Sequence, residues 1–151
     1  MNRRNFLNFA GSLVAISVIP MNLKAEDYRK LKPSVWEAHT IDDATKAMYG
    51  VKEVIKSDKI KITVPKINSS GAAVPVKFET SIDAKTIALF QDANPESAVG
   101  VYEVNKYDLK KYDVKIKMAE SGTIMVLVEG NDGKIYMAKA ETEVAAGGCE
   151  G

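Results

Sequence analysis

After Gly50, hydrophobic and polar residues alternate with a period of two. In segment 59–65, KIKITVP, every second residue is isoleucine or valine, and lysine or threonine stands between them. Alternation of this kind is typical of a β-strand with one buried face. Seven short runs rich in Val, Ile and Thr are therefore predicted to be strands. They cover residues 59–65, 74–80, 86–90, 99–104, 113–119, 123–130 and 134–144.

Turn-forming residues between these runs predict how the strands connect. Asn131-Asp132-Gly133 separates the last two runs and predicts a type I′ hairpin, because Asp-Gly tolerates positive φ angles. Residues 68–71 and 92–97 predict longer loops. Seven antiparallel strands at this spacing predict an all-β fold, an immunoglobulin-like antiparallel β-sandwich.

One short N-terminal helix is predicted ahead of the strands. Thr40 followed by Asp43 is a capping-box pattern, and the apolar residues Ala44 and Met48 recur at helical spacing. Gly50 predicts the C-terminal cap.

The first 25 residues have the order of a secretory signal: two arginines, an apolar stretch, and Ala25 at the expected cleavage site. The apolar stretch 9–20 is too short to span a bilayer. The pair Arg3-Arg4 followed by Phe-Leu resembles a twin-arginine signal, so we expect a periplasmic protein. Cleavage would leave 18 basic and 20 acidic residues, a formal net charge of −2.

Length and composition indicate one ordinary domain. The chain has 151 residues, of which 46% are hydrophobic and 27% charged, and the formal net charge is +1. Such a balance argues against a nucleic-acid partner. The expected division is a signal peptide (1–25), a helix plus β-sandwich domain (26–144) and a flexible carrier arm (145–151).

The residue types present argue against a metal site and against a hydrolase active site. One histidine, His39, and one cysteine cannot supply the four ligands of a zinc site, so neither a metal nor another cofactor is expected. No Gly-x-Ser-x-Gly elbow occurs. Met118, Met125 and Met137 lie within strand patterns and are predicted to pack in the core.

The single cysteine, Cys149, lies in the terminal sequence Gly147-Gly148-Cys149-Glu150-Gly151. Two glycines before a terminus predict flexibility, and no neighbouring base is fixed to activate the thiol. A protruding thiol suits a covalent carrier that presents one sulfur to several enzymes. The alternative is an exported immunoglobulin-like binding module whose free cysteine forms an intermolecular disulfide.

Four segments make the chain similar to the SoxY family, the sulfur carriers of the bacterial thiosulfate-oxidising (Sox) system. They are the arginine motif 2–7, the strand region 61–80, the closing strands 114–144 and the terminal GGCEG at 147–151. In the last segment Glu150 stands where the family has glycine.

The resemblance implies a carrier rather than an enzyme, with sulfur intermediates of thiosulfate oxidation attached to Cys149 and flexibility supplied by Gly147, Gly148 and Gly151. It implies a heterodimer with a SoxZ-like subunit and no membrane partner. It also implies three visiting enzymes: a c-type cytochrome that loads thiosulfate, a manganese-dependent hydrolase that releases sulfate and, where present, a sulfane dehydrogenase.

Overall fold

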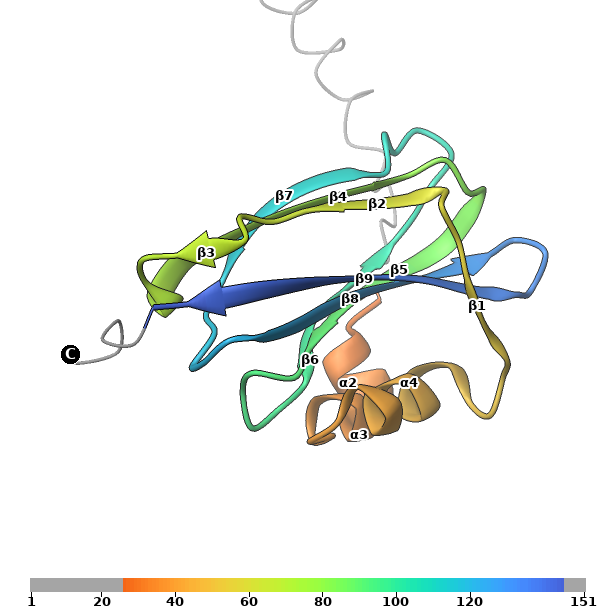
Figure 1. Ribbon diagram of the computed structural model, residues 1–151. Coiled ribbons are helices and arrows are strands. Elements are labelled where there is room, and N and C mark those ends of the chain that lie inside the picture. The colour runs from red at the N-terminus through yellow and green to blue at the C-terminus, as the bar shows by residue number, and fades with distance from the viewer. Residues whose placement is uncertain (1–25, 146–151) are drawn as a thin grey trace, which may run out of the picture.

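Two β-sheets face each other in the computed structural model, which describes residues 26–145 (Figure 1). The larger sheet has the strand order β1-β9-β8-β5-β6, with β3 also paired to β9, and the smaller sheet has the order β2-β4-β7. The strands are β1 (Val54–Lys56), β2 (Ile60–Thr63), β3 (Ile67–Asn68), β4 (Val74–Thr80), β5 (Ala84–Gln91), β6 (Ala98–Glu103), β7 (Lys111–Ile116), β8 (Gly122–Gly130) and β9 (Ile135–Val144). The helices are α2 (Tyr28–Leu31), α3 (Pro33–Trp36), α4 (Ile41–Tyr49) and the 3-10 turn η1 (Gly71–Ala73).

The predicted immunoglobulin-like all-β sandwich is confirmed, and each of the seven predicted runs overlaps a strand. The seven predicted strands pair antiparallel, and two further strands that the pattern missed, β1 and β3, pair with β9 in parallel. These strands have three and two residues, too few to show a period of two. The sequence pattern also missed the four-residue helices α2 and α3.

The predicted helix is α4, and its ends lie where the capping residues indicated. The Thr40 hydroxyl oxygen accepts a hydrogen bond from the backbone N–H of Asp43 at 3.1 Å, which satisfies one of the free donors of the first turn. Gly50 ends the helix with a φ of 75°, a conformation that glycine adopts without steric cost. One face of α4, including Ala44 and Met48, is buried.

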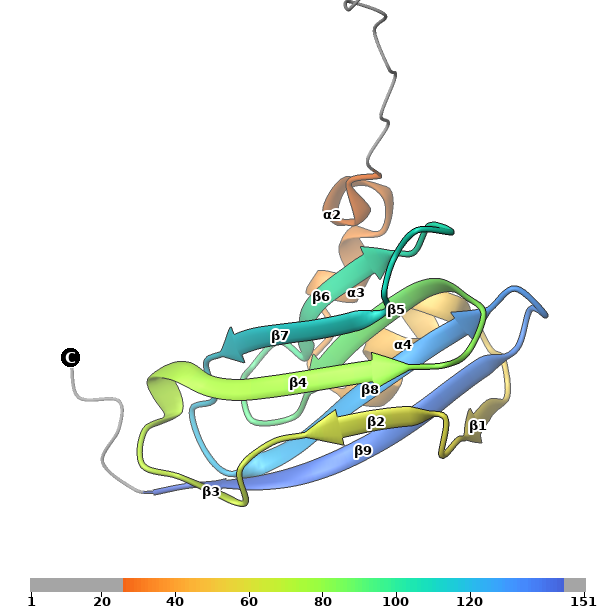
Figure 2. The same cartoon turned by 90° about the horizontal axis from the view of Figure 1, so that it is seen from above.

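The larger sheet is covered on both faces, so the domain has two apolar clusters. Ile87 and Leu89 of β5 point into the cluster between the two sheets. Ala88 and Phe90, which alternate with them, point into a second cluster beneath the helices. Figure 2 shows the three helices on the side of the larger sheet away from β2, β4 and β7. Burial on both faces explains why β5 and β8 are nearly continuous apolar runs.

The predicted methionine packing is confirmed, because Met118 and Met125 are buried and Met137 is partly buried against the helix-side cluster.

The predicted hairpin joins β8 to β9, but it is not a type I′ turn. That turn needs two residues with positive φ, and within residues 26–145 only Lys110, Gly50 and Gly133 have one. The Gly133 N–H donates to the Gly130 carbonyl at 2.9 Å, and the Gly130 N–H donates to the Lys134 carbonyl at 2.9 Å. The connection is therefore a three-residue loop with Gly133 in the left-handed position.

A small polar network ties the end of β9 to β3. The Asn68 side-chain amide donates to the Thr142 hydroxyl oxygen at 2.7 Å, and the Thr142 hydroxyl donates to the Pro65 carbonyl at 2.6 Å. Asn68 is 7% exposed and Thr142 is 3% exposed, so these groups have little access to water. The network holds β3 beside the last residues of β9, where the register pairs Asn68 with Val144.

Replacing Gly133 with alanine should lower the free energy of unfolding by about 1–2 kcal/mol, the usual cost of a left-handed L-residue. Urea denaturation measures the change. Gly133→Asn is the matched control and should lose less, because asparagine tolerates this conformation. Equal stability of the alanine variant and the parent would contradict the turn assignment.

Thr142→Val keeps the side-chain shape but removes the Thr142 hydroxyl from the network. The buried Asn68 amide then keeps only its longer contact with the Pro65 carbonyl at 3.4 Å, and the loss of the Thr142 hydroxyl should cost about 1–3 kcal/mol in urea unfolding. Thr63→Val, at an exposed position of β2, is the control and should change stability by less than about 0.5 kcal/mol. A Thr142→Val variant as stable as this control would show that the network does not hold β9.

Candidate functional site

The predicted carrier arm follows directly after the residues that the structure describes. The predicted attachment and signal residues lie outside the described range 26–145: Arg3, Arg4, Gly147, Gly148, Cys149 and Gly151. What the structure does describe is the base of the arm, by which we mean the end of β9 up to Ala145 together with the segments that bind it.

Consecutive backbone groups at the base of the arm are hydrogen-bonded to different segments. The Val144 N–H donates to the Ser121 hydroxyl oxygen at 2.9 Å. The Ala145 N–H donates to the Asn68 carbonyl at 2.9 Å. Covalent geometry limits the Cα of Cys149, four residues further on, to within about 14 Å of the Cα of Ala145.

Gly71 allows η1 to lie against the base of the arm. Its carbonyl accepts a hydrogen bond from the Met118 N–H at 2.8 Å. A Cβ at this position would collide with the Met118 carbonyl oxygen and would lie 3.1 Å from Val144 Cγ1. The sequence pattern predicted a loop at 68–71 but gave no sign of this contact, because the partners Met118 and Val144 are distant along the chain.

A shallow groove beside the base of the arm has a mixed polar lining. Two carboxylates, one ammonium group and three hydroxyl groups contribute to it. The lining residues are Lys66, Ser121, Gly122, Thr123, Glu141, Thr142 and Glu143. The groove thus lies beside the backbone hydrogen bonds of Val144 and Ala145, which fix the end of β9 in the fold.

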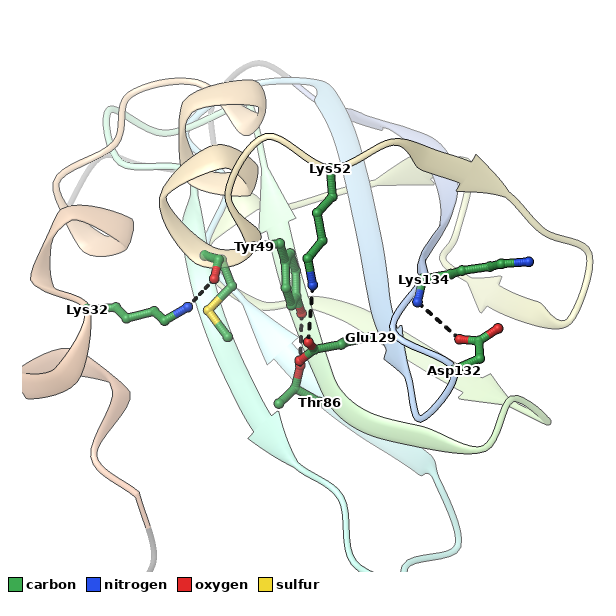
Figure 3. Close-up of polar contacts among 8 residues, drawn as sticks. Lys32, Tyr49, Lys52, Thr86, Glu129, Asp132 and Lys134 are labelled. Carbon is green, nitrogen blue, oxygen red and sulfur yellow. Dashed lines mark hydrogen bonds and ion pairs between the residues drawn. The ribbon is translucent and has the colours of Figure 1, made fainter.

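A second polar cluster joins α4 to the larger sheet (Figure 3). The Thr86 hydroxyl donates to Glu129 Oε2 at 3.3 Å, and the Tyr49 hydroxyl lies 3.2 Å from Thr86 Oγ1. Because the threonine proton is committed to the carboxylate, Tyr49 is the donor of the second bond. Lys52, in the segment after α4, lies 3.7 Å from Glu129 Oε1.

The chemistry of this second cluster is that of a structural link. Burial raises the pKa of Tyr49 well above its ordinary value. The hydrogen bond with Thr86 lowers this pKa by less than burial raises it, and the charge of Glu129 adds a still smaller increase. Tyr49 therefore stays neutral and cannot act as a base at physiological pH. Near the C-terminal end of α4, the Lys32 ammonium donates a hydrogen bond to the Met48 carbonyl. These contacts fasten the helices to the sheet.

The described residues offer no metal site. His39 is exposed, with its Nδ1 2.8 Å from the Pro95 carbonyl oxygen. Across residues 26–145, no three His, Cys, Asp or Glu side chains are grouped as metal ligands. No helix in that range has the length and apolar character needed to cross a bilayer.

Solved structures with low sequence identity share the fold. The superoxide reductase (neelaredoxin) from Ignicoccus hospitalis is 17% identical, with a TM-score of 0.51 over 57% of this chain and 80% of that chain. At this identity the likeness concerns the fold alone. Among curated proteins, none matches the chain.

A much closer likeness covers the sandwich and reaches the terminal cysteine. The sulfur carrier protein SoxY from Chlorobium limicola f thiosulfatophilum is 33% identical, with a TM-score of 0.65 over 72% of this chain and 95% of that chain. The family model of sulfur oxidation protein SoxY matches residues 45–149. The chain therefore belongs to the SoxY family of sulfur oxidation proteins.

Proposed function

We propose that this protein is a sulfur carrier that holds intermediates of thiosulfate oxidation covalently on Cys149. The observation that carries the proposal is that the SoxY family match extends to residue 149, the sole cysteine of the chain. The 33% identical structure is of a sulfur carrier protein. The sandwich holds the chain by hydrogen bonds up to Ala145, so the cysteine follows a fixed starting point after only three intervening residues.

Loading is an oxidation. The Cys149 thiol and thiosulfate form a sulfur–sulfur bond, giving a cysteine S-thiosulfonate, one proton and two electrons. A c-type cytochrome would be the oxidant that accepts the two electrons. The acceptor belongs to the partner enzyme, and this chain contributes the thiol.

Unloading begins with hydrolysis. Water attacks the sulfur of the terminal sulfonate group, and the sulfur–sulfur bond to that group breaks. Sulfate leaves with the three sulfonate oxygens and the water oxygen, one water proton goes to the persulfide that stays on Cys149, and the other proton is released. In the family this step belongs to a manganese-dependent hydrolase, and a sulfane dehydrogenase, where present, oxidises the remaining sulfur. Each enzyme would bring its own cofactor, so the carrier itself needs none.

The sequence around Cys149 suits a carrier better than an enzyme. Glu150 follows Cys149 directly, and an anionic neighbour disfavours the thiolate. A thiol beside a carboxylate reacts slowly until an enzyme supplies a base or a cation.

The proposal includes export and a partner subunit. Arg3 and Arg4 open a segment with the order of a twin-arginine signal, so the carrier would work in the periplasm. There it would form a heterodimer with a SoxZ-like subunit.

The full mature chain incubated with thiosulfate and a c-type cytochrome of the Sox system should gain one thiosulfate-derived mass increment. Intact-mass spectrometry measures it, and reductant or sulfite should reverse it. Cys149→Ser should show no increment, because the hydroxyl cannot form the sulfur–sulfur bond. Loading of the serine variant, or formation of a disulfide dimer alone, would overturn the carrier function.

Glu150→Gly should leave the urea unfolding curve unchanged and alter the rate of adduct formation, since it removes a bulky anionic side chain beside Cys149. Rapid-quench mass spectrometry of the loading reaction measures the rate. Glu150→Gln is the matched control, because it removes the charge and keeps the size. If all three proteins load at one rate, neither the charge nor the bulk of Glu150 affects access.

A further inference from the structure

The edge strands of the two sheets differ in how open they are to pairing with another chain. The larger sheet ends at β1 and β6, and the smaller sheet ends at β2 and β7. Among residues 26–145, β6 pairs only with β5. Half of the backbone N–H and C=O groups of such an edge strand point away from the sheet and can pair with another chain.

Three of the four margins carry features that discourage pairing. β1 has only three residues and ends in Lys56. β2 carries Lys61 at its centre. β7, with the sequence KYDVKI, alternates charged and apolar residues along its length. Short edges and charged side chains are the usual protection against strand addition.

β6 lacks this protection. Its sequence AVGVYE has no proline and no charged residue before Glu103, and its first five residues are half-buried. Val99 and Tyr102 pack partly against the cluster between the sheets, and Ala98 and Val101 pack partly against the helix-side cluster. Both faces of the strand are therefore apolar and incompletely covered.

Gly100 at the centre of β6 makes close approach easier. Glycine in a strand weakens it and often marks a place where another backbone comes near. A Cβ at Gly100 would lie 3.2 Å from the Tyr102 hydroxyl oxygen, which is a tight contact with a side chain rather than with backbone. The Tyr102 ring therefore covers one face of the strand at Gly100, and the glycine adds no side chain of its own at the centre of the edge.

The loop after β6 adds an apolar surface at its end. Tyr107 is 81% exposed and Leu109 is 88% exposed. The loop has a defined shape, because Asn105 Oδ1 accepts from the Tyr107 N–H at 2.8 Å and the Tyr112 hydroxyl donates to Asp108 Oδ2 at 2.8 Å. Two large apolar side chains are thus displayed from a folded loop.

We propose that the free edge of β6 binds an edge strand of the partner subunit and extends the larger sheet across the subunit interface. The inference rests on the proposed function, which supplies that partner. The partner strand must be uncharged along its centre and must place apolar side chains on alternate positions, to match the two faces of β6. A six-residue strand alone buries less than the roughly 1,200 Å² of a stable interface. We therefore assign Tyr107 and Leu109 to the same contact.

Hydrogen exchange of the full mature chain, with and without a purified SoxZ-family subunit from the same organism, tests the location. Amides of β6 should gain protection in the complex, while amides of β2 and β7 should not. Protection confined to another margin would overturn this inference and leave the proposed heterodimer standing.

Two variants test the energetics by isothermal titration calorimetry with the same subunit. Val99→Lys places a charge on the β6 edge and should raise Kd by about tenfold or more. Tyr107→Ser combined with Leu109→Ser changes only exposed side chains and should weaken binding at least severalfold. Thr63→Lys on the β2 edge is the matched control and should bind like the parent.

Unchanged Kd values for both test variants would overturn the inference. So would concentration-dependent protection of β6 in the isolated chain, which would make a second copy the occupant. If the parent does not bind the subunit but still loads thiosulfate on Cys149, the partner and this inference both fail and the carrier function stands.

Discussion

Backbone pairing along both sides of β9 is the constraint on which the rest of the domain depends. One side is paired with β8 from Ile135 to Thr142. The other side is paired with β1 at residues 135–137 and with β3 at residues 143–144. Between them the three neighbours pair with β9 at every residue up to Val144. An arm that starts from an edge strand would start from a frayed end, and here it starts from a paired one.

The alternating pattern was sufficient to predict the sandwich because most strands are long enough to bury one face or both. β4, with burial alternating along all seven residues, is the clearest case. The pattern failed where the strand is short, as in β3, or where tertiary contact decides the conformation. Asn68 and Thr142 are 74 residues apart, and nothing local to either residue predicts their hydrogen bond. The turn type at Gly133 was wrong for a related reason, since Asp-Gly fits more than one hairpin geometry.

The candidate site also has residues that the sequence could reveal and residues that only the fold brings together. Cys149 and its glycines were singled out because residue type and position near a terminus are visible in a sequence. The base of the arm was not, because Gly71, Met118 and Val144 come together only in the folded chain. The link from Tyr49 through Thr86 to Glu129 likewise joins a helix to two strands. Such contacts have no periodic signal, although each is ordinary once the strands are placed.

The close contact of Gly71 with Met118 and Val144 bears on how homologous chains can differ in length. The segment 65–73 is fastened to β9 at several points, so an inserted or deleted residue there would displace the residues from which the chain continues toward Cys149. The turn between β8 and β9 lies at the opposite end of the strand (Figure 1), and extra residues there would leave that origin in place. Insertions should accordingly accumulate at the hairpin during divergence and be purged from the segment that leads into η1.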